Sequence, residues 1–504
     1  MRLRDAVFDS LITTGGSRMK LNALIGRIPG KVSAIGNIEE VEIVKLCTDS
    51  RKVTEGALFF CTPGLRMDAH DFAPQAVAKG ASALIVERRL DVDVPQVIVE
   101  DVRIAMSYIA ADFYGNPADK MIMLGITGTK GKTTTSFLVK SIMEEAGMKT
   151  GLIGTVCSMI GDETIPTNLT TPDPVETQAI LTRMAEAGVQ CVIMEVSAHA
   201  LTMHRVAGIR FKVGAFSNFS QDHLDFYQDM DEYFAAKMLF MQPEYCENIV
   251  YNVDDERIAE GMRAFGRPAL RTGIREGSDV YANDIEIGER GCSFLMTWHK
   301  QFRISIDLKL AGIFNVYNAL MAAGICICAG IGPEAIRRGL EEVRAVPGRI
   351  ELLETDTPYR VILDYAHSPD SLENILKAVR QTARGRMIAL FGCGGNRDRA
   401  KRPIMGEIAG ELADFCILTS DNPRNEDPMD ILNAIEDGIR PTGCDYIVIE
   451  NRREAIRYAL KNAQPSDVIV LAGKGHETYQ EICGVKYPFD EKIVVAELLR
   501  ELAD

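Results

Sequence analysis

A segment rich in glycine, threonine and lysine, residues 125–135 (GITGTKGKTTT), carries the clearest chemical pattern in the chain. The backbone N–H groups of such a loop, and of the helix that starts in it, bind phosphate groups. Lys132 is placed to reach the terminal phosphates of a nucleotide, and the Thr133 hydroxyl is placed to hold Mg²⁺. The usual pattern needs glycine at position 126, where this chain has isoleucine. We therefore expect a variant nucleotide-binding loop over residues 128–133.

Two later segments, residues 194–201 (MEVSAHAL) and 218–225 (NFSQDHLD), add carboxylates and imidazoles. The first follows an apolar run, so Glu195 falls at the end of a strand, where a carboxylate is a suitable ligand for Mg²⁺. A single histidine such as His223 is usually a structural hydrogen-bonding residue. Its neighbours Asp222 and Asp225, together with the phosphate loop, favour a role in a metal site instead.

Lys237 stands among apolar residues in the segment 233–240 (YFAAKMLF). Burial of its ammonium group would lower its pKa and leave a nucleophilic amine. Taken alone, the segment fits better a helix lysine whose stem packs on apolar surface while its charge reaches water. The residues by themselves leave both readings open.

The elements that would position these groups appear as alternating apolar and polar runs. The apolar run 121–126 leads into the loop, and apolar residues recur at helical spacing after Thr133. Clusters of turn residues at 114–117 (YGNP) and 345–349 (AVPGR) divide the chain. We predict an α/β protein of three domains: a small N-terminal α/β domain (1–117), a central P-loop ATPase-type domain (118–345) and a C-terminal Rossmann-like domain (346–504).

In the C-terminal third, five short apolar runs have the character of buried parallel strands: 361–363, 387–391, 415–418, 446–449 and 468–471. Each is followed at once by polar or glycine-rich residues. Glycine and aspartate after a strand can simply form turns. Because ligands bind at the carboxyl ends of strands in open α/β sheets, chemically rich sequences after four of the five runs favour a binding edge.

Composition excludes several classes of function. Lys and Arg number 56 against 71 Asp and Glu, a net charge of −15, so the electrostatic footprint of a nucleic-acid-binding protein is missing. No apolar stretch reaches the roughly 18 residues of a membrane helix, and the first residues lack the apolar core of a signal peptide. Twelve cysteines lie mostly in apolar runs, and Cys326 and Cys328 lack a second Cys or His pair for zinc. We expect a cytoplasmic, monomeric protein.

The loop at 128–133 resembles the signature of the Mur ligase superfamily, ATP-dependent enzymes that form amide bonds, and the segments around Glu195 and His223 match that superfamily in the same order. The resemblance implies catalytic roles for Lys132, Lys237, His223 and Glu195. It implies two Mg²⁺ ions at Thr133, Glu195, His223 and Lys237, with Lys237 carbamylated by CO₂. The residues implied in ATP binding are Gly128, Thr129, Lys130, Gly131, Lys132, Thr133, Thr134, Asn315 and Arg349.

Segments 48–51 (TDSR), 70–72 (HDF) and 168–172 (NLTTP) resemble the branch of the superfamily that extends UDP-MurNAc-L-Ala-D-Glu to a tripeptide. Met203 stands where many relatives have glutamine, a change that removes one polar side chain. The implied contacts with this substrate are Thr48, Ser50, His70, Asp71, Phe72, Asn168, Thr170, Thr171, Ser197 and Arg205.

Residues 421–424 (DNPR) have the form that the resemblance associates with meso-diaminopimelate as the incoming amine. Diaminopimelate carries a second amino acid group, and arginine binds a carboxylate bidentately. Lysine lacks that carboxylate and would leave a desolvated guanidinium unpaired. Glu477 would receive the ammonium. The implied amine contacts are Arg397, Asp421, Asn422, Pro423, Arg424, Gly473 and Glu477.

The implied reaction has two steps: ATP phosphorylates the D-glutamyl γ-carboxylate, and the diaminopimelate amine then displaces phosphate. Within the enzyme class, a lysine-adding ligase or a folylpolyglutamate synthetase is the alternative. From another class, a P-loop switch or motor would need a partner protein and form no amide, which the segments at 421–424 and 473–477 argue against. The resemblance begins near Met19, so residues 1–18 are an extension or reflect a misassigned start.

Overall fold

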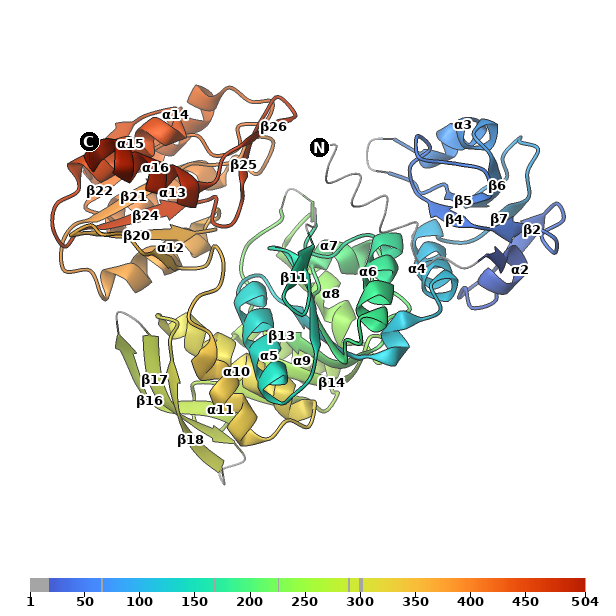
Figure 1. Ribbon diagram of the computed structural model, residues 1–504, viewed down its shortest axis with the longest axis horizontal. Coiled ribbons are helices and arrows are strands. Elements are labelled where there is room, and N and C mark those ends of the chain that lie inside the picture. Colours follow the sequence, from blue (N-terminus) through green and yellow to red (C-terminus); the bar gives the residue numbers. More distant parts are fainter. Residues whose placement is uncertain are drawn as a thin grey trace.

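The computed structural model describes residues 18–64, 67–165, 169–224, 226–288, 291–298 and 302–503. It forms three α/β units, with the central unit between the N-terminal and C-terminal ones (Figure 1). The α/β class and the three-part organisation expected from the sequence are confirmed. The possible extension at residues 1–18 falls almost wholly outside the described residues.

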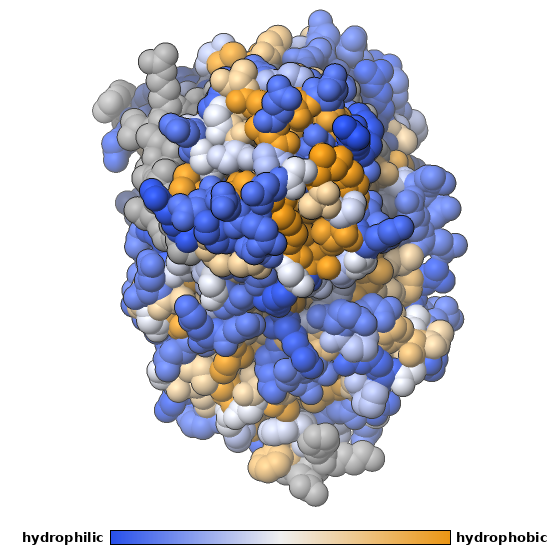
Figure 2. Space-filling view, turned by 90° about the vertical axis from the view of Figure 1, so that its right-hand side faces the viewer, coloured by the Kyte–Doolittle hydropathy of each residue, from blue (hydrophilic) through white to orange (hydrophobic). Residues whose placement is uncertain are grey.

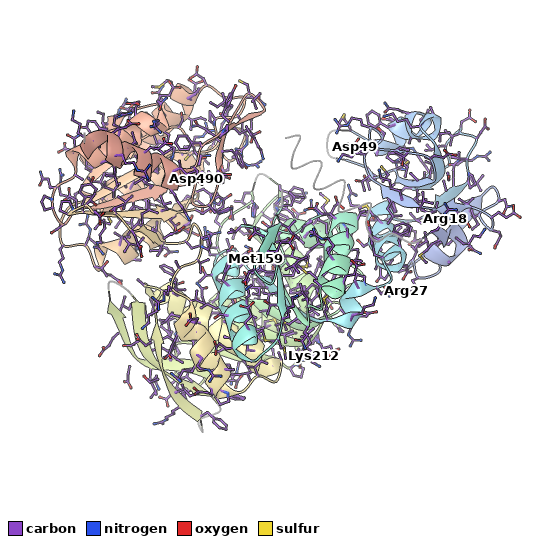
Figure 3. All side chains as sticks on the ribbon, viewed as in Figure 1. Arg18, Arg27, Asp49, Met159, Lys212 and Asp490 are labelled. Carbon is purple, nitrogen blue, oxygen red and sulfur yellow. The ribbon has the colours of Figure 1, made fainter. Side chains whose placement is uncertain are left out.

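The N-terminal unit is a sheet of order β2-β7-β6-β5-β4 with helices packed on it. Three short apolar runs of the sequence, 57–60, 83–86 and 96–99, correspond to its strands β5, β6 and β7. Arg27, labelled in Figure 3, donates to Asp112 Oδ1 at 2.7 Å and to Asn116 Oδ1 at 2.6 Å, and so ties the start of the unit to the end of α4. The elements are β1 (Met19–Lys20), α2 (Leu21–Leu24), β2 (Ser33–Ile35), β3 (Glu42–Ile43), β4 (Lys45–Cys47), β5 (Ala57–Phe60), α3 (Ala73–Ala78), β6 (Ala81–Val86), β7 (Gln96–Ile98) and α4 (Val102–Phe113).

The central unit is built on a long sheet of order β11-β10-β9-β12-β8-β13-β14-β15-β16-β17-β18. Its middle strands, from β9 to β16, are parallel, and both ends of the sheet are antiparallel hairpins. The strands are β8 (Ile122–Thr127), β9 (Thr150–Ile153), β10 (Ser158–Ile160), β11 (Glu163–Ile165), β12 (Cys191–Glu195), β13 (Phe211–Phe216), β14 (Cys246–Asn252), β15 (Leu270–Gly273), β16 (Val280–Gly288), β17 (Gly291–Trp298) and β18 (Phe302–Leu308). The helices are α5 (Lys132–Glu145), α6 (Pro174–Glu186), α7 (Ala198–Thr202), α8 (Met230–Met238), α9 (Glu256–Phe265), α10 (Ile313–Cys328) and α11 (Pro333–Glu342).

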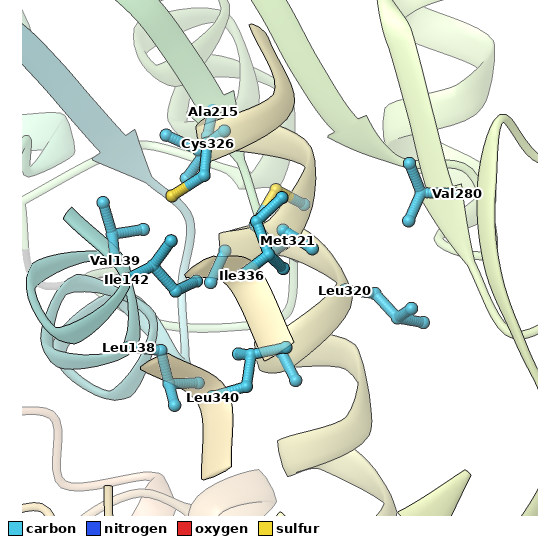
Figure 4. Close-up of a cluster of buried hydrophobic side chains, with 14 of the residues drawn as sticks. Leu138, Val139, Ile142, Ala215, Val280, Leu320, Met321, Cys326, Ile336 and Leu340 are labelled. Carbon is cyan, nitrogen blue, oxygen red and sulfur yellow. The ribbon is translucent and has the colours of Figure 1, made fainter. Parts of the chain in front are cut away.

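The core of the central unit holds the helix that begins at the phosphate loop. Leu138 and Ile142 of α5 pack with apolar side chains of α10 and α11 (Figure 4). Gly339 allows this approach, because a Cβ there would lie 2.4 Å from the Ile142 Cα. Cys326 is fully buried in the same cluster and acts as a small apolar side chain. The packing fixes α5, and with it the loop at its N-terminus.

The C-terminal unit has a sheet of order β19-β20-β24-β21-β22-β23, parallel except for β19. All five strands expected from apolar runs are present: β21 and β22 have the expected ends, and the ends of the other three differ by at most one residue. A hairpin of β25 and β26 stands apart from the sheet. The elements are β19 (Glu351–Leu353), β20 (Arg360–Asp364), α12 (Pro369–Arg380), β21 (Met387–Phe391), α13 (Lys401–Leu412), β22 (Phe415–Leu418), α14 (Pro428–Ile439), β23 (Tyr446–Val448), α15 (Arg452–Asn462), β24 (Val468–Ala472), β25 (Tyr479–Ile482), β26 (Val485–Pro488) and α16 (Glu491–Ala503).

On the face shown in Figure 2, which is the side of the N-terminal unit, hydrophilic residues surround an apolar group in the upper half. None of the helices in the described part of the chain is both long and apolar enough to span a bilayer. All twelve cysteines are free, and Cys483 is exposed in the turn between β25 and β26.

Candidate active site

The phosphate loop runs from the end of β8 into α5, as the sequence predicts. Two of its glycines have positive φ, 146° at Gly128 and 78° at Gly131. A Cβ on Gly128 would lie 2.0 Å from the Ser217 hydroxyl, and one on Gly131 would lie 2.3 Å from Asn318 Oδ1. Both positions therefore need glycine, for the backbone conformation and for the close approach of neighbouring segments.

Two lysines converge on one carbonyl of this loop. The Gly128 oxygen accepts from Lys132 Nζ at 2.8 Å and from Lys237 Nζ at 2.8 Å. Burial lowers the pKa of Lys237 well below its usual value, and the charge of Lys132 lowers it further. Burial also lowers the pKa of Lys132, against the opposing charges of Glu195 and Asp222. Lys237 is 1% exposed, so of the two readings of its segment the buried amine is correct.

A cavity of about 500 Å³ opens beside the loop, between the central and C-terminal units. Two polar groups on its wall are buried and have no hydrogen-bond partner among the described residues: Ser220 Oγ and Arg349 Nε. Unpaired buried donors of this kind are unfavourable unless a ligand binds them. The cavity is lined by Lys130, Gly131, Thr133, Thr134, Ser217, Asn218, Ser220, Asn252, Asp254, Asp255, Leu310, Phe314, Asn315, Tyr317, Asn318, Val346, Arg349, Ile350, Asp364, Asp370, Ser371, Glu373, Asn374 and Ile375.

Two of the residues expected to bind ATP, Asn315 and Arg349, line this cavity. Asn315 lies in the first turn of α10 and donates to the Ala311 carbonyl at 2.8 Å. Arg349 follows the Pro-Gly turn, and its Nη2 donates to the Thr133 hydroxyl at 3.4 Å. The phosphate loop also reaches the C-terminal unit through Lys130, whose ammonium contacts the Ser368 hydroxyl.

Glu195 ends β12 with its side chain fully buried. Its Oε1 accepts from the Thr155 backbone N–H at 3.1 Å, and its Oε2 accepts from the Thr155 hydroxyl at 2.8 Å. A Cβ on Gly154 would lie 2.4 Å from Oε1, so a larger residue there would displace the carboxylate. The carboxylate oxygens are ligands that Mg²⁺ prefers, and so is the buried Thr133 hydroxyl at the loop.

Residues expected to contact the nucleotide-linked substrate gather next to Glu195. The Thr171 hydroxyl donates to the Glu195 carbonyl at 2.8 Å and accepts from the Ser197 N–H at 3.1 Å. Arg205 Nη1 donates to the Thr171 carbonyl at 2.9 Å, and Thr170 lies 3.0 Å from the Thr155 hydroxyl. Asn168 lies outside the described residues. The other four thus form one connected group beside the predicted Mg²⁺ ligand.

His223 is much more exposed than Glu195, the other histidine or carboxylate expected at the metal site. It has φ of 57°, its side chain is 41% exposed, and its Nε2 is 3.9 Å from Asp222 Oδ2. Burial would raise the pKa of Asp222, but the charges of His223, His367 and Lys130 hold it well below its usual range. Over the residues that the structure describes, no group of three or more His, Cys, Asp or Glu is arranged to hold a metal ion. Asp225 is outside those residues.

The substrate contacts expected in the N-terminal unit differ in their burial and in their hydrogen-bond partners. Thr48 is exposed and lines a small hollow of about 50 Å³ with Asp173. The Ser50 hydroxyl donates to Gln75 Oε1 at 2.9 Å. Both His70 nitrogens are engaged, Nδ1 with Asp68 Oδ1 at 2.6 Å and Nε2 as acceptor from the Glu87 N–H at 3.0 Å. With both nitrogens engaged, His70 holds the next two residues, the exposed Asp71 and Phe72, in place.

At the C-terminal unit, the segments after β22 and β24 meet at one sheet edge, as the sequence predicts. Asn422 Nδ2 donates to Glu477 Oε2 at 2.9 Å. Gly473 has φ of 112°, and a Cβ there would lie 2.5 Å from Asp421 Oδ2. Pro423 is buried, whereas Arg397 is exposed on the loop after β21.

One residue of this edge, Lys474, was not among the predicted site residues. Its side chain is fully buried and donates to Asn422 Oδ1 at 2.6 Å, to Glu477 Oε2 at 3.1 Å and to the Tyr479 carbonyl at 2.8 Å. The sequence feature that could have pointed to Lys474 is its position between two glycines, Gly473 and Gly475. Its inward direction depends on positive φ at both glycines, which the sequence pattern does not specify.

The fold and the site define a P-loop nucleotide-binding protein whose central unit carries one further α/β unit on either side. Three family models match successive parts of the chain: "Mur ligase family, catalytic domain" at 42–115, "Mur ligase middle domain" at 126–326 and "Mur ligase, glutamate ligase domain" at 348–475. The chain belongs to the Mur ligase family.

Similar proteins of known name cover nearly the whole chain. A UDP-N-acetylmuramoyl-L-alanyl-D-glutamate–2,6-diaminopimelate ligase from Geobacillus thermodenitrificans is 45% identical over 492 residues, 96% of this chain and 100% of the relative. A ligase of the same name from Caldanaerobacter subterraneus subsp. tengcongensis is 43% identical over 480 residues, 95% of this chain and 99% of the relative. A solved structure of a ligase with that name is 30% identical, with a TM-score of 0.67, and the match covers 97% of this chain and 100% of that chain.

Proposed function

We propose that the protein is an ATP-dependent ligase that joins meso-2,6-diaminopimelate to the D-Glu γ-carboxylate of UDP-MurNAc-L-Ala-D-Glu, a step of peptidoglycan precursor synthesis. The observation that carries the choice of amine is the placement of Arg424, Asn422 and Glu477 on one sheet edge, in a chain 43–45% identical to ligases of that name. An arginine and a carboxylate on one edge match the carboxylate and the ammonium of an amino acid group.

ATP binding is supported by the cavity at the phosphate loop. The buried, unpaired Arg349 Nε and Ser220 Oγ are suited to donate to a phosphate oxygen. Lys132 has its ammonium at the loop carbonyls, where it would stabilise the charge of the transferred phosphoryl group. Phosphorylation of the γ-carboxylate gives an acyl phosphate, which the amine attacks with loss of phosphate.

The residues present fit Mg²⁺, because Thr133 and Glu195 supply hard oxygen ligands beside the loop. Bound there, the ion would neutralise charge on the phosphate oxygens. The Thr133 hydroxyl and the Glu195 carboxylate would bind it, and Thr155 orients that carboxylate through two hydrogen bonds. We assign His223 and Lys237 to a second ion.

Carbamylation of Lys237 is supported by its surroundings. A neutral amine is the form that reacts with CO₂, and burial together with Lys132 favours that form. The product carbamate would place a negative charge next to Lys132, which now shares the Gly128 carbonyl with a second potential cation. The carbamate would therefore be attracted by Lys132, whereas a protonated Lys237 would be repelled by it.

We further propose the unit boundaries 1–117, 118–345 and 346–504, a monomeric state and a cytoplasmic location. The free state of all twelve cysteines supports a reducing compartment. The cavity between the central and C-terminal units supports a closing movement that brings the amine to the acyl phosphate and keeps water out.

The test is phosphate release and product mass with UDP-MurNAc-L-Ala-D-Glu, ATP and Mg²⁺, adding meso-diaminopimelate or L-lysine in parallel. We expect phosphate release that depends on diaminopimelate, and a product whose mass corresponds to the added diaminopimelate. Preference for lysine would refute the amine assignment. Activity only with a folate substrate, or ATP hydrolysis without any amide product, would refute the proposed reaction.

A further inference from the structure

We propose that Lys474 is the positioning residue of the amine site, and that its buried ammonium fixes Asn422 and Glu477 in the orientation that receives the distal amino acid group of the substrate. This inference rests on the proposed function, since it takes a diamino acid as the amine. Lys474 itself would not touch the substrate.

The backbone around Lys474 is shaped to turn its side chain inward. Gly473 and Gly475 have φ of 112° and 51°. A Cβ on Gly475 would lie 2.8 Å from the Tyr365 Cβ, so the turn packs closely against the segment after β20. Glycine on both sides permits this conformation, which other residues adopt only with strain. The side chain between them is fully buried, although lysine is rarely buried without a partner.

The ammonium of Lys474 has all three of its N–H groups occupied by the chain. It donates to Asn422 Oδ1 at 2.6 Å, to the Tyr479 carbonyl at 2.8 Å and to Glu477 Oε2 at 3.1 Å. An ammonium has three donors, so none remains for a phosphate or a substrate carboxylate. Its function is therefore to hold the neighbouring side chains.

The contact with Asn422 decides how that amide is turned. Asn422 Oδ1 accepts from Lys474 and also from the Glu481 backbone N–H at 2.8 Å. With the oxygen held by two donors, Nδ2 points to Glu477 Oε2. Lys474 Nζ and Asn422 Nδ2 both donate to Glu477 Oε2. We therefore assign the other oxygen, Glu477 Oε1, to the substrate ammonium.

The charges at this edge suit an amino group. Burial alone would raise the pKa of the Asp421 carboxyl, but the Lys474 ammonium, 3.5 Å away, is foremost among the charges that hold it below its usual range. The same ammonium lies 3.1 Å from Glu477 Oε2, so one cation contacts both carboxylates. Without Lys474, Asp421 and Glu477 would lose this shared cation, and the site would lose its fixed geometry.

The experiment replaces Lys474 with two neutral residues, Lys474→Met and Lys474→Gln, in the full chain. We expect the KM for the amine to rise at least about tenfold, because a hydrogen bond to a charged group is lost and its partners reorient. The KM values for ATP and for UDP-MurNAc-L-Ala-D-Glu, and kcat at saturating amine, should stay within about twofold, since those ligands bind elsewhere. The preference for diaminopimelate over lysine should also fall.

The matched control is Lys486→Met. Lys486 is exposed on β26, and its ammonium lies 4.0 Å from the centre of the Tyr479 ring, next to the Lys474 network but outside it. It should leave all constants unchanged. Equal rises in all three KM values, an unchanged amine KM in a folded variant, or failure of both variants to fold would overturn the inference. If the parent protein shows no phosphate release that depends on diaminopimelate, the proposed function fails instead. The Lys474 variants then test the positioning role with the amine that the parent does use.

Discussion

The Arg424 guanidinium is already paired within the chain: its Nε lies 3.3 Å from Glu481 Oε2, and its Nη1 donates to the Gly395 carbonyl at 2.9 Å. The two backbones also pair, since the Arg424 N–H donates to the Glu481 carbonyl at 3.0 Å and Arg424 has φ of 53°. The arginine that we assign to the substrate carboxylate is thus held in place by β25. A substrate carboxylate must share the guanidinium with Glu481 or displace it.

Glu481→Gln should therefore strengthen binding of diaminopimelate. The change keeps the size of the side chain and removes the competing charge, so the KM for diaminopimelate should fall by roughly two- to fivefold, the range of a partly exposed ion pair. Steady-state kinetics at low amine concentration measures it, with Glu497→Gln on α16 as a control remote from this edge. A higher KM would mean that Glu481 orients Arg424 more than it competes for it.

Arg424→Ala should cost the amine substrate a charge-assisted contact, at roughly 2 to 5 kcal/mol when its carboxylate is left unpaired. Diaminopimelate turnover at low concentration should collapse, while the KM values for ATP and the nucleotide substrate change little. Arg453→Ala, which removes a surface arginine of α15, is the matched control. If the amine KM and turnover of Arg424→Ala stay as in the parent, Arg424 is an ordinary loop residue and the assignment is wrong.

Lys132→Ala should lower the rate of product formation by orders of magnitude, because electrostatic stabilisation of the transferred phosphoryl group is lost. The fold should persist, since the Lys132 ammonium contacts loop carbonyls rather than the core. Thermal unfolding checks the fold, and Lys140→Ala on the same helix, which breaks an ion pair with Glu144, is the control. Near-normal turnover in a folded Lys132→Ala variant would remove the phosphate-loop assignment.

Lys237→Ala should be nearly inactive and should regain part of its activity with formate or acetate, because a small carboxylate can occupy the position of the lost carbamate. The Lys237 side chain is buried, which leaves a space for such an anion. Lys212→Ala, at the exposed Lys212 labelled in Figure 3, should behave as the parent with or without added acid. Full activity of Lys237→Ala without any additive would exclude a role for the carbamate.

Glu176 predicts a pH dependence of stability. Burial raises its pKa to about 8, with the Asp173 charge acting the same way and the Arg205 charge opposing. Because the folded pKa lies above the unfolded value, the folded state binds the extra proton, and stability falls as pH rises from about 4.5 to about 8. Glu176→Gln should remove this loss and so raise the stability of the free protein at pH 9 by up to a few kcal/mol, with little change at pH 4.

The measurement is denaturant unfolding of the substrate-free protein at several pH values. Glu186→Gln, at the exposed end of the same helix, should show the pH dependence of the parent. An equal effect of Glu176→Gln at pH 4 and pH 9 would show that ionisation of Glu176 is not responsible.

Local patterns in the sequence were enough to predict the phosphate loop, the five parallel strands of the C-terminal sheet and the sheet edge that carries Asn422 and Glu477, but not the antiparallel strand β19. These features depend on apolar periodicity and on turn residues within a few positions of each other, which fold in much the same way in any α/β context. The hairpin of β25 and β26 and the outer strands of the central sheet did not stand out, because their residues are partly exposed and lack a continuous apolar run.

Only the tertiary structure decided which side chains meet. Lys132 and Lys237 share one carbonyl although they are 105 positions apart in the sequence. Lys474 reaches Asn422 across 52 positions, and Arg424 reaches Glu481 from a different strand. Such pairs depend on strand order and on the positive φ of single glycines, and neither is encoded in the spacing of residue types. The sequence therefore determined the chemistry available to this protein, and the packing of three units determined which groups act together.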